Sequence, residues 1–142
     1  MLFCGNHVDA PGLAGGKQKG HQIAVKLLCD QVIGTLEPAF RSETDINVIG
    51  EFNVKGEVAH LRSILRCFGI RILASIPGDA RFEEIACAHR AKLSLDLCSQ
   101  AMPGLANVLT ERYGIPSVHG SLYGSRPFSE TLRRLARRTR VS

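Results

Sequence analysis

The sequence has no tryptophan and few aromatic residues, which argues against a surface for binding nucleic acid. Phenylalanine and tyrosine together make up 6% of the 142 residues, although the formal net charge is +5. Much of the positive excess lies in the stretch 133–140, and no aromatic side chain lies between its arginines. Single strands are held by aromatic rings that stack on bases as well as by cations. This basic end can instead bind phosphate or an anionic surface, or form the solvated face of a terminal helix.

Long apolar runs are also missing. No stretch approaches the roughly 20 apolar residues that a membrane-spanning helix requires. Residues 1–12 lack the basic segment and the apolar core of a secretory signal. The apolar share of 44% and the charged share of 22% are ordinary for a globular protein. We therefore expect a soluble, cytoplasmic protein that does not bind membranes.

The cysteines form no recognisable metal or redox motif. They lie at positions 4, 29, 67, 87 and 98, and no two of them have the C-x-x-C spacing of zinc or redox sites. A disulfide framework is not expected in the cytoplasm. Cys29, Cys67 and Cys87 lie in apolar helical patterns and are predicted to be buried small hydrophobes. At most one or two of the thiols should carry chemistry.

The sequence does contain a regular alternation of strand and helix patterns. Short apolar stretches predict strands at 46–49, 70–76, 93–98 and 115–120, and helical spacing follows each of them. Repeated units of this kind predict a Rossmann-like, doubly wound α/β fold. Its parallel sheet should have about four strands and carry helices on both faces.

The residues before the sheet are expected to form a separate leading part. An additional helix is predicted over 16–38, where Pro38 ends it, and an exposed link follows. We therefore divide the chain into a leading segment with its helix and linker, residues 1–44, and an α/β domain, residues 45–142.

Four loops of this fold should meet at the ligand-binding edge of the sheet. In parallel α/β sheets, ligands bind outside the carboxyl ends of the strands. Those ends lead here into loops at 50–56, 77–81, 98–102 and 120–126. The loops lack the Walker and G-x-G-x-x-G patterns, so nucleotide binding has no specific support. Arg81 opens a helix in the second loop, where its guanidinium can clamp an anion or simply face the solvent.

Cys98 is the most informative position of this edge, because a buried strand is expected to pass there directly into a helix. The partial positive charge at a helix N-terminus favours the thiolate, which is the form that binds iron or zinc. No general base is evident nearby, so ligation is favoured over nucleophilic catalysis. A core cysteine that fills space is the alternative, and the pattern leaves both open.

Three segments carry a resemblance to a known family. "DINVIGEFNVKGEV" (45–58), "GIRILASIPGDARFEEIACAHRAKLSLDLCSQAM" (69–102) and "ERYGIPSVHGSLYGS" (111–125) strongly resemble the nitrogenase component 1 family, in particular its alpha-like branch. The resemblance implies a Rossmann-like middle domain of a much longer chain. It further implies a scaffold that holds an iron–sulfur cluster precursor while the iron–molybdenum cofactor of nitrogenase matures, rather than a catalyst.

The same resemblance implies partners and site residues. The scaffold would pair with a beta-like paralogous subunit as a heterotetramer, interact with cofactor-delivery proteins, and pass its product to apo-nitrogenase. Cys98 corresponds to the cysteine that ligates the finished cofactor, and it is the expected metal ligand. The residues expected to bind the cofactor around it are Ser99, Gln100, Arg81, Gly50 and Asn53.

Several features depart from the family pattern, among them Pro103 and Gly104 at the expected start of a helix. His119 stands where the family usually has an acidic residue, and the arginine-rich end is also atypical. An anion- or nucleotide-binding α/β module and an inactive truncated fragment therefore remain alternatives to a working scaffold.

Overall fold

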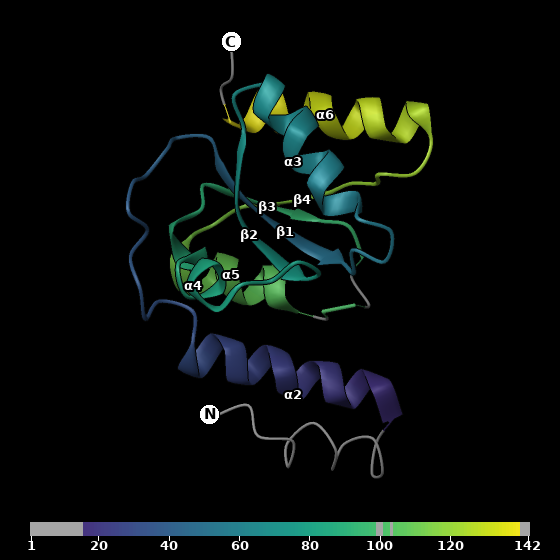
Figure 1. Cartoon of the computed structure of the whole chain (residues 1–142). Coiled ribbons are helices and arrows are strands. Elements are labelled where there is room, and N and C mark those ends of the chain that lie inside the picture. Colours follow the sequence, from purple (N-terminus) through teal and green to yellow (C-terminus); the bar gives the residue numbers. More distant parts are fainter. Residues whose placement is uncertain (1–15, 99–100, 103, 140–142) are drawn as a thin grey trace.

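The computed structural model describes residues 16–98, 101–102 and 104–139 (Figure 1). Its centre is a sheet of four strands: β1 (Asp45–Glu51), β2 (Arg71–Pro77), β3 (Leu93–Asp96) and β4 (Ser117–His119). The helical elements, in chain order, are α2 (Gly16–Gln31), α3 (Glu57–Cys67), α4 (Phe82–Ala86), the 3-10 turn η1 (Ala88–Arg90), α5 (Leu105–Tyr113) and α6 (Ser125–Thr139). None of these described helices combines the length and the apolar character that crossing a membrane demands.

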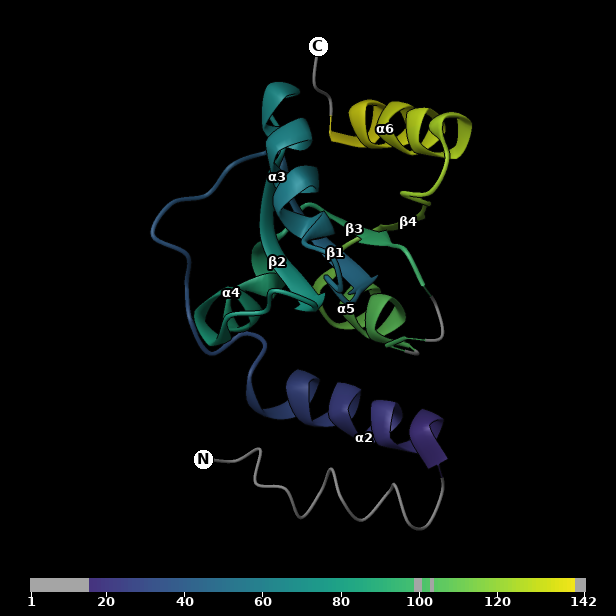
Figure 2. The ribbon, with the colours of Figure 1, turned by 45° about the vertical axis from the view of Figure 1, so that its right-hand side comes forward.

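All four strands are parallel, and their order in the sheet is β2-β1-β3-β4. β1 lies between two neighbours and is buried along its whole length, as expected for a strand covered on both faces. The structure thus confirms the predicted α/β fold with a parallel sheet and helices on both faces (Figures 1 and 2).

Side-chain alternation along β1 divides the core into two layers. Ile46 and Val48 belong to a cluster with residues of α3 and α6, among them Leu65 and Leu135. Ile49 belongs to the opposite cluster, which contains residues of α2 and α5. Figures 1 and 2 accordingly show α3 and α6 on one face of the sheet and α2, α4 and α5 on the other.

The leading helix ends earlier than predicted. α2 stops at Gln31 rather than at Pro38. Shortly after it, Gly34 has a positive φ of 93° and donates its N–H to the carbonyl oxygen of Ala86 at 2.9 Å. Glycine adopts such a backbone readily, so this turn can redirect the chain into the link that leads to β1.

The link is fixed to the α/β core by Glu37. Its carboxylate accepts hydrogen bonds from the Arg90 guanidinium, the shortest at 2.6 Å, and another from Arg41 at 2.8 Å. The hydrogen bond from Arg90 is the largest of several causes that lower the pKa of Glu37 to about 2. This contact holds the link beside η1.

The prediction that three cysteines are buried is right for Cys29 and Cys87 but wrong for Cys67. On α3 the buried stripe is formed by Val58, Leu61 and Leu65. At about 100° per residue, Cys67 points roughly opposite to that stripe, which leaves it exposed. Cys4 lies outside the described residues.

Candidate functional site

The loops at the carboxyl ends of β1, β2 and β3 pack closely, because glycines leave room for neighbouring backbone. Gly50, near the end of β1, has a φ of 90°, and a Cβ atom there would lie 2.7 Å from the backbone nitrogen of Cys98. A Cβ atom at Gly78, directly after β2, would lie 2.5 Å from the carbonyl oxygen of Glu51. Real Cβ atoms do not occupy such distances. Both glycines are therefore required for this edge of the sheet.

Cys98 lies in the loop after β3, and its side chain is exposed as a free thiol. The chain before it is tied to β1, because Leu97 donates its N–H to the Ile49 carbonyl oxygen at 2.8 Å. The carbonyl oxygen of Cys98 itself accepts the N–H of Ala101 at 3.1 Å. The structure thus excludes the core-cysteine alternative and presents this thiol to solvent from a fixed backbone.

The expected direct passage from the strand into a helix is wrong. α5 begins only at Leu105, and its N-cap residue is Gly104. A helix terminus acts on charges within about its first turn, so the predicted stabilisation of a Cys98 thiolate by a directly following helix loses its basis. The accessibility of Cys98 comes from the loop itself.

Asn53 supports the loop after β1 through its own hydrogen bonds. Its side-chain oxygen accepts the N–H of Val58 in the first turn of α3 at 3.1 Å. Its backbone N–H donates to a carboxylate oxygen of Glu51 at 2.9 Å, and its φ is 56°. Asn53 therefore shapes the loop between β1 and α3, which lies against Gly78 after β2, and its side-chain oxygen is already engaged inside the protein.

Arg81 lies at the predicted position, as the N-cap residue of α4, and its side chain is exposed. Sheet order separates it from the other candidates, because β1 lies between β2 and β3. Its loop is thus two strand spacings, or about 10 Å, from the strand that leads to Cys98. Ser99 and Gln100 lie outside the described residues. The structure brings Gly50 and Cys98 together and leaves Arg81 at the flank.

Sequence reasoning missed Asp96, which pairs with His119 across the ends of β3 and β4. The two side chains approach to 4.0 Å between Asp96 Oδ2 and His119 Nδ1. Asp96 Oδ1 is buried without a hydrogen-bond partner among the described residues. The available signal was a carboxylate at a position of "LSLDLC" that alternates with the leucines, two residues before the cysteine.

The described part of the chain contains no group of three His, Cys, Asp or Glu side chains that could hold a metal ion. One exposed thiol cannot enclose a bare ion, because structural metal sites use several protein ligands. It can displace one ligand of a cluster that is already assembled. The edge is therefore chemically suited to tether a preformed cluster at a single point.

The sequence of this chain matches a protein-family model and several known proteins. Residues 6–142 match the family model described as nitrogenase component 1 type oxidoreductase. Two relatives named nitrogenase iron-molybdenum cofactor biosynthesis protein NifE, from Rippkaea orientalis and Klebsiella pneumoniae, are 46% and 42% identical to this chain. Each match covers 91% of this chain, and 27% and 30% of the respective relative.

A solved structure described as "Nitrogenase Cp1 at pH 6.5" has the same fold. It superposes with a TM-score of 0.79 at 29% sequence identity, over 87% of this chain and 25% of the other. The chain thus spans about a quarter of the length of the proteins that it matches.

Proposed function

Because the chain belongs to the nitrogenase component 1 type oxidoreductase family, we propose that it forms the cluster-holding α/β unit of a scaffold for assembling the iron–molybdenum cofactor. The names of the similar biosynthesis proteins support this assignment. In this proposal residues 45–142 form that unit, residues 1–44 lead into it, and both are part of a longer polypeptide. The cluster is cargo, so no catalytic residue is assigned.

The observation that carries the proposal is the exposed thiol of Cys98 at the carboxyl end of β3. An incoming iron–sulfur precursor would exchange one of its thiolate ligands for Cys98. The new Fe–Sγ bond replaces the old Fe–S bond, and the Cys98 proton leaves with the displaced thiol. Such an exchange needs no change in oxidation state and can be reversed at delivery, as a scaffold requires.

The neighbouring residues are proposed to set the position of this thiol. Gly50 lets the Cys98 backbone lie against β1, and Asn53 shapes the adjoining loop. Arg81 at the flank would contribute positive charge toward an anionic cluster. Ser99 and Gln100, next in sequence, are proposed to complete the binding set.

We also propose that the full-length protein pairs with a beta-like paralogous subunit, interacts with cofactor-delivery proteins, and passes its product to apo-nitrogenase. Membership of a family whose name refers to nitrogenase component 1 supports a setting of this kind. The cytoplasm is the proposed location.

The test is ligand exchange with a synthetic iron–sulfur cluster that carries small, exchangeable thiolates. The wild-type chain should retain the cluster through gel filtration, with iron and visible iron–sulfur absorption in the protein fraction. Cys98→Ser should lose this retention, while Cys67→Ser, which changes the other thiol that is exposed among the described residues, should keep it. Equal iron content in both variants would reject the assignment of Cys98.

A further inference from the structure

A pocket lined by three arginines lies at the amino ends of β1 and β2, on the edge of the sheet opposite to Cys98. Its volume is about 390 Å³. α3 contributes Arg62 and Arg66, and β2 begins with Arg71. No acidic residue belongs to the described lining, which also includes Phe40, Ser42, Thr44 and Gly69. This hollow is called the arginine pocket below.

The guanidinium of Arg71 is fixed in place by its neighbours. Its Nε donates a hydrogen bond to Asp45 Oδ1 at 2.6 Å, and its Nη2 donates to Asp45 Oδ2 at 2.5 Å. Asp45 is fully buried, and the guanidinium carbon lies 3.8 Å from the centre of the Phe40 ring. Within the described part of the chain, Nη1 of Arg71 takes part in no hydrogen bond. Arg71 therefore offers a positioned donor that the fold itself does not use.

Arg66 supplies positive charge that no neighbouring acid balances. Arg62 and Arg71 each pair with acidic side chains that lie outside the arginine pocket. The side chain of Arg66, in contrast, forms no ion pair and no hydrogen bond with any described residue. It follows Arg62 by one helical turn, and like charges at this spacing repel each other. An anion in the arginine pocket would relieve this repulsion.

The other polar groups around the pocket are already engaged. Thr44 Oγ1 donates a hydrogen bond to the Gly69 carbonyl oxygen at 2.6 Å, and Ser42 Oγ lies 2.9 Å from Thr44 Oγ1. The N–H of Gly69 bonds to the Arg66 carbonyl oxygen at 2.9 Å. Carbonyl oxygens at the end of α3, which would repel an anion, thus have donors of their own. The donors that remain for a ligand belong to the arginines.

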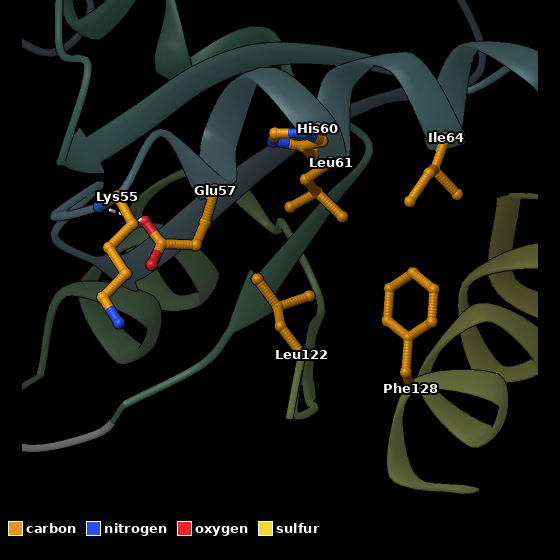
Figure 3. Close-up of a pocket in the computed structure, with 7 residues that line it drawn as sticks. All are labelled: Lys55, Glu57, His60, Leu61, Ile64, Leu122 and Phe128. Carbon is orange, nitrogen blue, oxygen red and sulfur yellow. Dashed lines mark hydrogen bonds between the residues drawn. The ribbon is translucent and has the colours of Figure 1, made fainter. Parts of the chain in front are cut away.

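Two other hollows beside α3 have a different charge balance. One of about 530 Å³ is lined by the same three arginines, but also by Glu37, Glu83 and Glu84. Another, between α3 and α6, has an apolar floor, and its Lys55 and Glu57 offset each other (Figure 3). Both are therefore less suited to an anion than the arginine pocket.

Two guanidiniums from different elements suit a phosphate group better than a carboxylate. A single carboxylate, such as that of Asp45, is satisfied by one guanidinium in this chain. A phosphate has more acceptor oxygens and a larger negative charge, so it can bridge Arg66 and Arg71. The pocket volume lies within the range of about 300–1,000 Å³ of small-molecule sites. It leaves room for the group that carries the phosphate, beside the 62% exposed Phe40.

We propose that the arginine pocket binds the phosphate group of a small phosphate monoester. The phosphate oxygens accept hydrogen bonds from Arg66 and from Nη1 of Arg71, and the organic part of the ligand packs against Phe40. Binding is non-covalent, so no bond is made or broken. Because the pocket and Cys98 lie at opposite edges of the sheet, this inference does not depend on the proposed cluster site.

Isothermal titration calorimetry on the complete 142-residue chain tests the proposal. The probe is phenyl phosphate, which combines a phosphate monoester with a ring. Inorganic phosphate lacks the ring, and benzoate has a carboxylate in place of the phosphate. Phenyl phosphate should bind, whereas the two comparison ligands should bind about tenfold more weakly or not at all.

Replacements of Arg66 locate the binding site without touching the contact that holds Asp45. Arg66→Gln should weaken binding of phenyl phosphate about tenfold or more, because the charge and the paired donors are lost. Arg66→Lys keeps the charge but not the planar fork, and should weaken binding several-fold. Arg138→Gln is the matched control, since it removes an exposed arginine of α6 outside the pocket, and it should leave binding unchanged. Circular dichroism verifies that each variant is folded.

Three results would overturn the proposal. The first is the absence of binding of phenyl phosphate to the wild-type chain. The second is equal affinity for phenyl phosphate and either comparison ligand, because the ester would then not be recognised. The third is equal weakening by Arg66→Gln and Arg138→Gln, which would attribute binding to the overall positive charge of the chain instead of the arginine pocket.

Discussion

Replacing Gly50 by alanine should destabilise the protein through two separable effects. Alanine at a φ of 90° adopts a backbone that L-residues disfavour, at a cost of about 1–2 kcal/mol. Its Cβ would also lie 2.7, 2.9 and 3.1 Å from the backbone N, O and Cα atoms of Cys98. These atoms belong to main chain that is hydrogen-bonded to β1, so relieving the overlap should cost about 1–3 kcal/mol more. Together we expect a loss of about 2–5 kcal/mol.

Gly56→Ala is the matched control. Gly56 also has a positive φ, 79°, but a Cβ there would meet no atom within 4 Å. Its replacement should therefore show only the backbone cost of about 1–2 kcal/mol. Urea unfolding of the wild-type chain and both variants measures the difference. Equal losses in the two variants would refute the conclusion that the Cys98 segment is held against β1.

Two further predictions concern thiol exposure and the link before the sheet. Brief treatment of the folded chain with a thiol reagent should modify Cys67 and Cys98. It should spare Cys29 and Cys87, because they are buried and burial raises the pKa of each thiol. Peptide mass mapping checks this, and rapid labelling of Cys29 or Cys87 would contradict it. For Glu37, whose pKa falls from 4.5 to about 2 mainly through Arg90, the ionised form stabilises the folded state above about pH 4.5, and this contribution is lost as the pH falls toward 2. Glu37→Gln should therefore be less stable than wild type near neutral pH, and the difference in stability should shrink as the pH falls from about 4.5 toward 2. If the difference in urea midpoints did not change with pH, the negative charge of Glu37 would not be what stabilises its contact with Arg90.

The regular elements could be predicted because their signals are local. The apolar stretch around Ile46 and Val48 and the spacing of Val58, Leu61 and Leu65 each reflect one periodicity within a short segment. Strands that alternate with helices through short loops leave few arrangements other than a parallel sheet. The boundaries were less predictable, as the early end of α2 shows, because the turn at Gly34 is tied to Ala86, far along the chain.

Burial of individual side chains could be predicted only in part. Cys67 and Cys29 both follow apolar helical patterns, yet one is exposed and the other is packed in the core. A pattern shows that a helix has an apolar side, but the orientation of the helix on the sheet decides which borderline positions are covered.

The sequence by itself determined the strand–helix alternation, the glycine-rich loops and the presence of a thiol at the end of a strand. Only the tertiary structure decided that this thiol is exposed, that Gly50 lies against it, and that Arg81 is set apart from it by β1. The tertiary structure also decided the strand order and the pairing of Asp96 with His119. The physical reason is that periodicity and turn chemistry act between near neighbours. Contacts among strand ends depend instead on how distant segments are placed in the sheet.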